Sequence, residues 1–201
     1  MIFEEKLISS EKIYDGAILN LRRDKVTAVK GEAYREIIEH NGAVCMVPVT
    51  SDGKVVLVEQ FRYAMGQVVL EVPAGKIDKG ETDPVKTAVR ELKEETGFSA
   101  GDVRFLGMIN TSVAYSQEKI YVYGMAELTR GETNFDDDEA IDMKLIDFDE
   151  AYHMAVTGQL IDVKTIAALA MAKEQMKDIL KKRSKNGQYR VQRKVHKLSE
   201  E

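Results

Sequence analysis

The sequence has one cysteine and three histidines among its 201 residues, and these scarcities exclude several kinds of site. Cys45 lies in an apolar run, so we expect a small buried side chain of a cytosolic protein rather than a disulfide partner or nucleophile. His40, His153 and His196 lack the spacing of metal ligands. No apolar run approaches the roughly 20 residues that cross a bilayer. The first six residues have neither a basic start nor an apolar signal core, which predicts a cytoplasmic protein.

Charge is unevenly distributed along a chain that is otherwise typical of a packed domain. Hydrophobic residues make up 44% and charged residues 31%, with a net charge of −5. Residues 181–201 nevertheless hold eight lysines and arginines and only two glutamates. Such a basic tail could bind nucleic acid. With one aromatic residue, Tyr189, and no RNA-binding signature, it favours a solvated or partner-contacting tail, and nucleic-acid binding is not expected.

The pattern of strands and helices predicts an α+β fold in three parts. Residues 1–42 read as a β-rich N-terminal extension, 43–180 as the main domain and 181–201 as the basic tail. Strands are expected at 43–49 and 55–61, joined by a hairpin turn at 51–53, and at 68–72, 103–109, 120–126 and 143–148. Helices are expected at about 84–96, 149–157 and 162–182. The expected arrangement is a mixed sheet with helices packed on it, in an α/β/α sandwich.

The expected helix at 84–96 carries three closely spaced carboxylates. Glu91 and Glu95 are i,i+4 neighbours, and Glu94 is three positions from Glu91. Clustered carboxylates repel unless a cation lies among them, and hard oxygen ligands suit Mg²⁺ or Mn²⁺. A solvated surface helix is the alternative interpretation. Val85, Ala88, Val89 and Leu92 predict the core face, Asp83 an N-cap, and Gly97 a left-handed residue after the helix.

These residues resemble the Nudix box, a motif written G-x5-E-x7-R-E-U-x-E-E-x-G-U, in which U is a bulky apolar residue. Its positions are filled by Gly75, Glu81, Arg90, Glu91, Leu92, Glu94, Glu95, Gly97 and Phe98. Between Glu81 and Arg90 there are eight residues where the pattern has seven. We expect the additional residue in the turn at 82–84, which leaves the register from Arg90 to Phe98 intact. The resemblance implies the Nudix fold and hydrolase chemistry.

The resemblance also implies roles for individual residues. Glu91 and Glu95 would bind Mg²⁺, with Glu94 as a further ligand, the Ala74 carbonyl completing the site and Arg90 orienting the glutamates. Within the acidic segment 136–139, Glu139 corresponds to a glutamate that helps to activate water, although such a run is often only a solvated loop. Arg35, Arg62 and Ser112 are candidates for substrate binding, and the two arginines could equally lie on an ordinary surface. In the loop 111–118, Val113-Ala114 replaces the Pro-Gly that is common in this subfamily.

Segments around the box resemble the bacterial ADP-ribose pyrophosphatases, which are homodimers whose N-terminal strands reach the partner subunit. The segments are 35–40, 59–62, 72–77 and 158–162. This resemblance implies Mg²⁺-dependent hydrolysis of ADP-ribose to AMP and ribose 5-phosphate by a homodimer. An extension packed on its own domain is the alternative to the dimer. The alternative functions are a pyrophosphatase for another nucleotide sugar, such as GDP-mannose, and a sensor that binds ADP-ribose without cleaving it.

Overall fold

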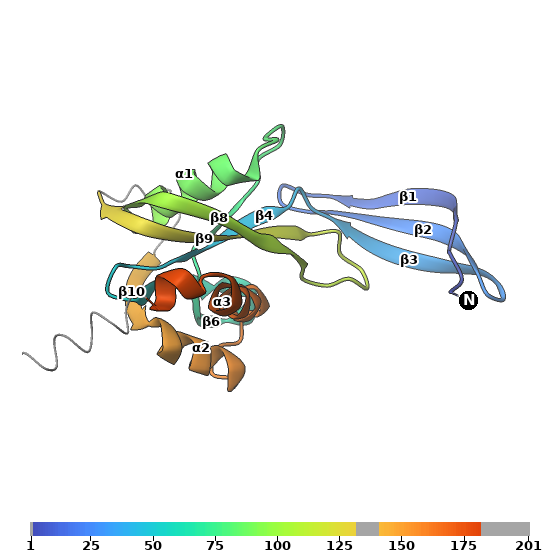
Figure 1. Ribbon diagram of the computed structural model, residues 1–201. Coiled ribbons are helices and arrows are strands. Elements are labelled where there is room, and N and C mark those ends of the chain that lie inside the picture. The colour runs from blue at the N-terminus through green and yellow to red at the C-terminus, as the bar shows by residue number, and fades with distance from the viewer. Residues whose placement is uncertain (1, 132–140, 182–201) are drawn as a thin grey trace, which may run out of the picture.

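The computed structural model describes residues 2–131 and 141–181, which form a layered body and a projecting three-stranded sheet (Figure 1). The projecting sheet contains β1 (Leu7–Asp15), β2 (Asn20–Ala28) and β3 (Gly31–Glu39). Glu139 and the basic tail beyond residue 181 lie outside the described residues.

Two further sheets form the centre of the body. The first has the strand order β7-β4-β9-β8, built from β7 (Ala74–Lys76), β4 (Ala43–Pro48), β9 (Lys119–Arg130) and β8 (Phe98–Asn110). It is mixed, because β4 runs parallel to β9 while its other pairs are antiparallel. The second is antiparallel, with β10 (Ile141–Asp147), β5 (Lys54–Arg62) and β6 (Gln67–Glu71) in that order. A short 3-10 turn, η1 (Tyr63–Met65), joins β5 to β6.

Helices cover the two sides of this body and bury two apolar clusters. Helix α1 (Pro84–Thr96) lies on one side, and α2 (Phe148–Val156) and α3 (Val163–Gln175) lie on the other (Figure 1). Alternate residues of β4 face opposite ways: Cys45 and Val47 join the cluster with α2 and α3, whereas Val44 and Met46 join the cluster with α1. The α+β fold with an α/β/α arrangement and a β-rich extension is therefore confirmed.

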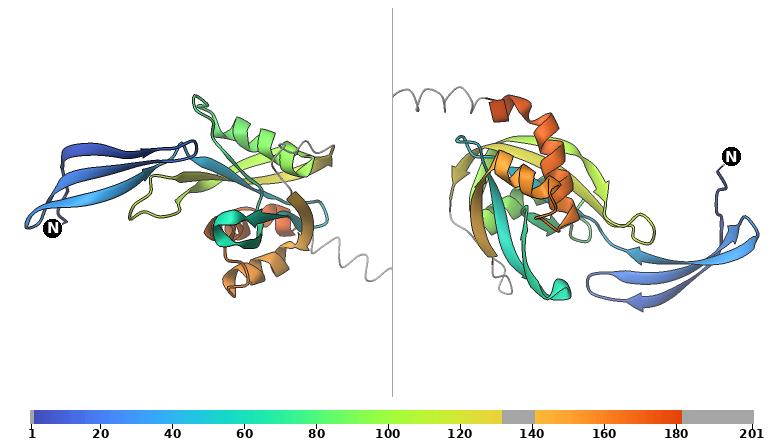
Figure 2. Two further views of the ribbon diagram at one scale, coloured as in Figure 1. Left: turned by 180° about the vertical axis from the view of Figure 1, so that it is seen from behind. Right: turned by 90° about the horizontal axis from the view of Figure 1, so that it is seen from below.

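The N-terminal sheet makes few contacts with the body from which it projects (Figure 2). Every residue of β1 is exposed, and within the described residues β1 pairs only with β2. The sheet is attached where β3 continues toward β4. There the Ile38 N–H donates to the Tyr115 carbonyl (2.7 Å), and the Gln117 N–H donates to the Ile38 carbonyl (2.9 Å). A loop between β8 and β9 therefore supports the base of the extension.

The prediction that strands 43–49 and 55–61 pair as a hairpin is wrong. A turn occurs at the predicted place, with the Gly53 N–H donating to the Thr50 carbonyl (2.9 Å), but the strands then separate into different sheets. Only the isolated bridge between Val49 and Val55 joins them. The reason is that β4 is a buried central strand whose two edges are already taken by β7 and β9.

Element ends account for the other differences. The segment 74–76, read from the sequence as part of a turn, forms the short strand β7, and β8 and β9 extend beyond the predicted 103–109 and 120–126. The last long helix was expected to continue to 182, but α3 ends at Gln175 and Met176 interrupts the helix. Cys45 is fully buried, as expected, and burial raises the pKa of its thiol to about 12. Within residues 2–131 and 141–181, no helix is long and apolar enough to cross a membrane.

Candidate functional site

Helix α1 begins and ends as the sequence predicts. It spans Pro84 to Thr96, with proline in the first turn. Gly97 adopts a left-handed conformation (φ 71°), and its N–H donates to the Lys93 carbonyl (2.9 Å). Asp83 is the N-cap residue, as predicted, but its side chain makes no capping hydrogen bond. The helix is continuous from Pro84 to Thr96, so Arg90, Glu91, Glu94 and Glu95 lie in one helical register.

The buried face of α1 places carboxylates beside the core. Ala88 and Leu92 are fully buried, whereas Val89, expected on this face, is 41% exposed. The predicted apolar stripe is therefore wrong at Val89, since successive helical residues are about 100° apart and Ala88 takes the inward position. Thr87 and Glu95 are also buried, with Glu95 only 5% exposed. A carboxylate at that depth needs polar partners.

Glu95 and Glu91 meet the backbone of β7. The Ala74 N–H donates to Glu95 Oε2 (3.1 Å), which places this carboxylate at the start of the strand. The side chain of Glu91 packs so closely on Gly75 that a Cβ at residue 75 would overlap its carboxyl group. Glycine is required at this position because the helix and strand approach each other with a carboxylate between them. The first glycine of the motif is thus explained by packing.

Arg90 links the remaining carboxylates of the helix. Its guanidinium lies 2.8 Å from Glu91 Oε1 and 2.6 Å from Glu94 Oε2. Burial lowers the pKa of Arg90, but the charges of Glu91 and Glu94 outweigh that effect and the pKa is raised. Arg90 therefore stays charged and holds both glutamates, as the sequence predicts for an orienting residue.

Glu81 lies in the loop before α1 and is held by hydrogen bonds. The Asp78 N–H and the Thr87 hydroxyl each donate to Glu81 Oε2, at 3.0 Å. The backbone hydrogen bond from Asp78, followed by the one from Thr87, lowers the pKa of Glu81. These contacts anchor the loop to the helix, and the positive charge of Arg90 contributes to the same pKa shift.

The carboxylates fit a hard divalent cation by their chemistry, although they are not grouped as a finished site. Glu91, Glu94 and Glu95 carry the carboxylate oxygens that Mg²⁺ prefers as ligands, and Glu95 accepts from the Ala74 N–H. Among residues 2–131 and 141–181, no three His, Cys, Asp or Glu side chains are already arranged to hold a metal. A cation would therefore take up contacts that Arg90 and the Ala74 N–H now make.

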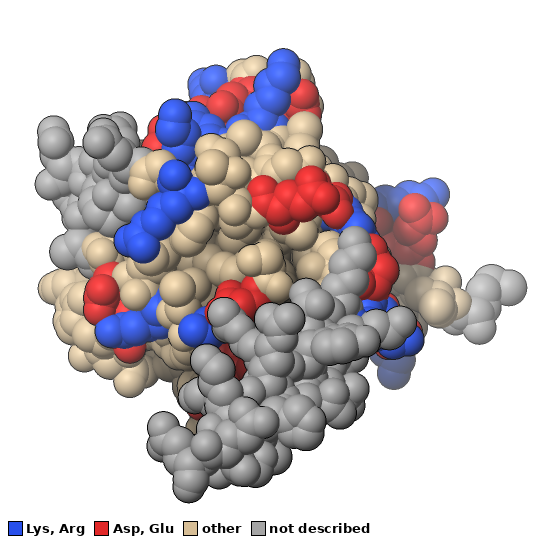
Figure 3. All heavy atoms as spheres, turned by 60° about the vertical axis from the view of Figure 1, so that its left-hand side comes forward, with Lys and Arg blue, Asp and Glu red and all other residues tan. Residues whose placement is uncertain are grey.

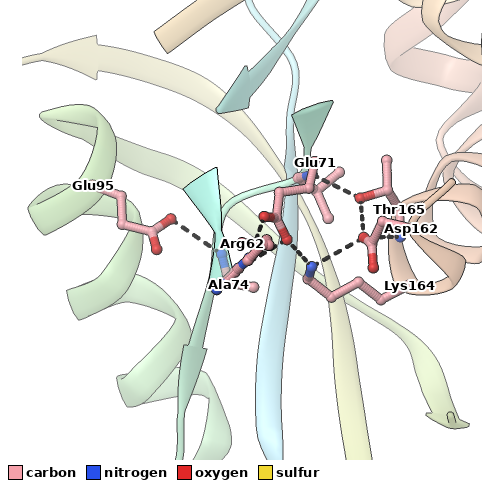
Figure 4. A network of polar contacts seen from close by, with 8 residues as sticks. Arg62, Glu71, Ala74, Glu95, Asp162, Lys164 and Thr165 are labelled. Atoms are coloured by element: carbon pink, nitrogen blue, oxygen red, sulfur yellow. Dashed lines mark hydrogen bonds and ion pairs between the residues drawn. The ribbon is translucent and has the colours of Figure 1, made fainter. Parts of the chain in front are cut away.

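A second polar network lies beside Glu95 and brings Arg62 into the site (Figure 4). Arg62 donates from Nε (2.6 Å) and Nη2 (2.9 Å) to the two oxygens of Glu71, which is 2% exposed. Lys164 forms a close ion pair with the same carboxylate and donates to Asp162 Oδ2 (3.0 Å). Thr165 completes the network, since its hydroxyl accepts from the Val72 N–H (2.9 Å) and donates to Asp162 (2.5 Å).

Sequence reasoning identified Arg62 and missed the other side chains of this network, which are Glu71, Asp162, Lys164 and Thr165. Lys164 and Thr165 come from the start of α3, and the contacts of Lys164 with Glu71 and of Thr165 with Val72 each span 93 positions in the chain. One signal was present: Glu71 is the only charged residue in the otherwise apolar stretch 68–74. A carboxylate inside a buried strand is rarely tolerated without a partner.

The other two predicted substrate residues lie apart from the glutamates. Arg35 is on the exposed face of β3, where its guanidinium pairs with Glu5. Ser112 is in the loop between β8 and β9, where its carbonyl accepts from the Tyr115 and Ser116 N–H groups (3.2 and 2.9 Å). Within one chain, therefore, neither residue is brought to α1.

A cavity of about 630 Å³ lies at the junction of the extension and the body. It is lined by His40, Asn41, Gly42, Asn110, Val113, Ser116, Gln117, Lys119 and Tyr121. It borders the strand pair that carries the site, because the Gly42 carbonyl accepts from the Ile77 N–H (3.1 Å) and Val44 pairs with Gly75. On the face shown in Figure 3, the acidic and basic side chains of the described residues are interspersed, without one extended basic patch.

Comparison with known proteins identifies the family of this chain. A sequence model of the NUDIX domain matches residues 39–169. The chain is 37% identical to the "methanol dehydrogenase activator" of Bacillus methanolicus, over 84% of this chain and 92% of that protein. It is 35% identical to the "ADP-ribose pyrophosphatase" of Bacillus subtilis (strain 168), over 83% of this chain and 91% of that protein. The chain therefore belongs to the NUDIX domain family and is a Nudix hydrolase.

Two further comparisons bear on the fold and on the range of activities among relatives. A solved structure described as an ADP compounds hydrolase superposes with a TM-score of 0.77 at 21% identity, covering 89% of this chain and 97% of that one. That likeness supports the fold. The "GDP-mannose pyrophosphatase" of Yersinia pestis (strain Pestoides F) is 32% identical over 76% of this chain and 80% of that protein. Relatives named for two different substrates thus align with most of the length of this chain.

Proposed function

We propose that this protein hydrolyses the pyrophosphate bond of ADP-ribose in the presence of Mg²⁺, giving AMP and ribose 5-phosphate. The observation that carries the proposal is the convergence of Glu91 and Glu95 on the backbone of 74–75, beside the paired guanidinium of Arg62. The name of the Bacillus subtilis relative supports ADP-ribose as the substrate.

Each residue contributes in a way that follows from its charge and position. Glu91 and Glu95, with Glu94 and the Ala74 carbonyl, would hold Mg²⁺ or Mn²⁺, and Arg90 keeps the glutamates in place. When bound, the metal would supply charge neutralisation for the two phosphates and a bound water of lowered pKa. Arg62 would bind a phosphate oxygen with the edge of its guanidinium that faces away from Glu71. Glu139, outside the described residues, is the proposed base that takes the proton of the attacking water.

The proposed active form is a cytoplasmic homodimer. The extension supports it, because β1 is exposed along its whole length and its outer edge is open within the described residues. Large apolar side chains are exposed there: Leu7, Ile8, Ile13, Tyr14, Ile18, Leu19 and Tyr34. In such a dimer Arg35 and the loop that carries Ser112 would serve substrate binding at the junction of the extension and the body. The full burial of the thiol of Cys45 is compatible with a reducing compartment.

Hydrolysis of another nucleotide sugar is the second candidate, and the Yersinia relative favours GDP-mannose. A sensor without turnover is less well supported, since a protein that only binds has no need of the carboxylate set of α1. For the Bacillus methanolicus relative, the printed name describes an effect on a dehydrogenase rather than a substrate.

A substrate panel separates these functions. ADP-ribose and GDP-mannose would each be incubated with the full-length protein and Mg²⁺, and nucleoside monophosphate would be quantified by chromatography. The proposal predicts AMP from ADP-ribose with the higher kcat/KM. A higher kcat/KM for GDP-mannose would replace ADP-ribose with that substrate, and tight binding without any product would identify a sensor.

A further inference from the structure

The buried carboxylate of Glu71 contacts two cationic side chains that come from different elements. Arg62, at the end of β5, takes both oxygens from one side, and Lys164, in the first turn of α3, pairs with Oε2. Burying a carboxylate costs several kcal/mol unless its lone pairs are satisfied in good geometry. Both cations therefore contribute to holding Glu71 where it is.

Lys164 is itself fixed by the start of α3. Its side chain is 12% exposed, and Nζ also donates to Asp162 Oδ2 (3.0 Å). Asp162 caps the helix by accepting from the Thr165 N–H (3.0 Å). The ammonium group is thus held between two carboxylates on a rigid element, so the position of its contact with Glu71 is set by the fold.

Arg62 is the most solvent-accessible of these charged side chains. Its side chain is 43% exposed, far more than those of Glu71 and Lys164. The hydrogen bond with Glu71 raises the pKa of Arg62, and the charge of Glu95 adds to the same shift, so the guanidinium lies within the field of the α1 carboxylates. Figure 4 shows the alternating order of charges from Arg62 through Glu71 and Lys164 to Asp162.

We propose that Lys164 is a positioning residue for substrate binding. Lys164 occupies one side of the Glu71 carboxylate and so holds Arg62 on the other side, where the guanidinium of Arg62 meets the pyrophosphate. The inference rests on the proposed function. Without Lys164, the buried carboxylate of Glu71 loses its second cation and keeps only the hydrogen bonds from Arg62. The guanidinium of Arg62 is then drawn further inward to compensate for the lost charge. Arg62 then loses its contact with the substrate although it is still present.

The test is a double-mutant cycle on binding, measured with ADP-ribose in EDTA by isothermal titration calorimetry so that no turnover occurs. Lys164→Met should weaken binding roughly tenfold, the size of one charged hydrogen bond. In an Arg62→Met background, Lys164→Met should have no further effect, because its action passes through Arg62. Lys173→Met is the matched control: it removes a lysine from the same helix that pairs with the exposed Asp149, and it should leave the Kd unchanged.

The outcomes separate the inference from the proposed function. Equal binding by Lys164→Met and Lys173→Met, or an equal loss in the wild-type and Arg62→Met backgrounds, would overturn the positioning role while the function stands. A wild-type protein that neither binds ADP-ribose nor forms AMP with Mg²⁺ would overturn both. If Lys164→Met does not fold, Lys164→Gln repeats the cycle, since an amide can donate to Glu71 but carries no charge.

Discussion

At the scale of single residues, the site depends on how closely α1 approaches β7. Glu95 lies in the core with a backbone N–H as a partner, and Glu91 fills the space that a side chain at residue 75 would need. In the sequence motif these residues are Gly75, Glu91 and Glu95, with 15 residues between Gly75 and Glu91 and 19 between Gly75 and Glu95. A change at Gly75 should therefore affect the carboxylates before it affects the rest of the fold.

Gly75→Ala should lower the free energy of unfolding by about 1–3 kcal/mol, the usual cost of overpacking, and should weaken Mg²⁺ binding. The reason is that the added methyl group displaces the Glu91 carboxyl group. Urea denaturation and calorimetric titration with Mg²⁺ measure the two effects. Gly101→Ala in β8 is the control, since its nearest neighbour would be the flexible end of Glu127 at 3.0 Å. Unchanged Mg²⁺ affinity in Gly75→Ala would contradict the place given to Glu91.

Glu139→Gln should lower kcat more than it raises KM for ADP-ribose, as expected for a group that acts mainly in the transition state. A loss of roughly 100-fold or more in kcat corresponds to removal of a general base. Steady-state kinetics at saturating Mg²⁺ measure both constants. If only KM rises, Glu139 is a binding residue and another group takes the proton.

At the scale of elements, the first turn of α3 connects the helix layer to the site. Thr165 accepts from the Val72 N–H, two residues before Ala74, and Lys164 reaches Glu71. Burial raises the pKa of Asp162, but the charge of Lys164 and the hydrogen bonds from Thr165 outweigh it, so the pKa is lowered on folding. Asp162 therefore stabilises the fold at pH values above its unfolded pKa of about 3.9, and that stabilisation is lost as the pH falls through the lower folded pKa.

Asp162→Asn should reduce the free energy of unfolding by roughly 1.5–3 kcal/mol at pH 7, because the amide keeps the helix cap but loses the charge that pairs with Lys164. The difference from the wild type should shrink as the pH is lowered from 6 to below 3.9. Urea denaturation across this range measures it. Asp149→Asn, which removes an exposed partner of Lys173, is the control. A difference that stays constant with pH would show that the charge of Asp162 does not stabilise the fold.

The sequence predicts an element well when the residues that determine it lie within the element itself. Helix α1 is predicted to the residue because Pro84 starts it and Gly97 ends it, and both signals lie in the segment itself. Three features depend on neighbours from other parts of the chain, and the sequence does not predict them: the missing side-chain hydrogen bond at the Asp83 N-cap, the exposure of Val89 and the pairing of β5. The contact between Lys164 and Glu71 joins two segments that the sequence does not relate to each other.

At the scale of the whole molecule, the extension makes few contacts with the body among the described residues. Its attachment is the short pairing of Ile38 with 115–117, next to the cavity at the junction. An exposed strand edge with apolar side chains readily pairs with another chain. The exposed edge therefore favours binding of the extension to another chain. The sequence resemblance implies that this partner is a second copy of the protein.

Deletion of residues 1–40 should give a monomer with poor activity if these strands build the dimer and complete the substrate site. Light scattering coupled to size exclusion measures the mass and the soluble fraction, and AMP formation measures the activity. The full-length protein is the reference and should have twice the mass of one chain. A fully active soluble monomer after deletion, or a monomeric full-length protein, would show that the site is complete within one chain.

AMP formation from ADP-ribose as a function of Mg²⁺ tests whether the carboxylates of α1 hold a metal for pyrophosphate hydrolysis. The wild type should form AMP and ribose 5-phosphate in equal amounts with Mg²⁺ and neither in EDTA. Glu95→Gln should keep the fold and lose most turnover, on the order of 100-fold or more, whereas Glu174→Gln, at an exposed site on α3, should match the wild type. Wild-type kcat in Glu95→Gln at saturating Mg²⁺ would contradict the account.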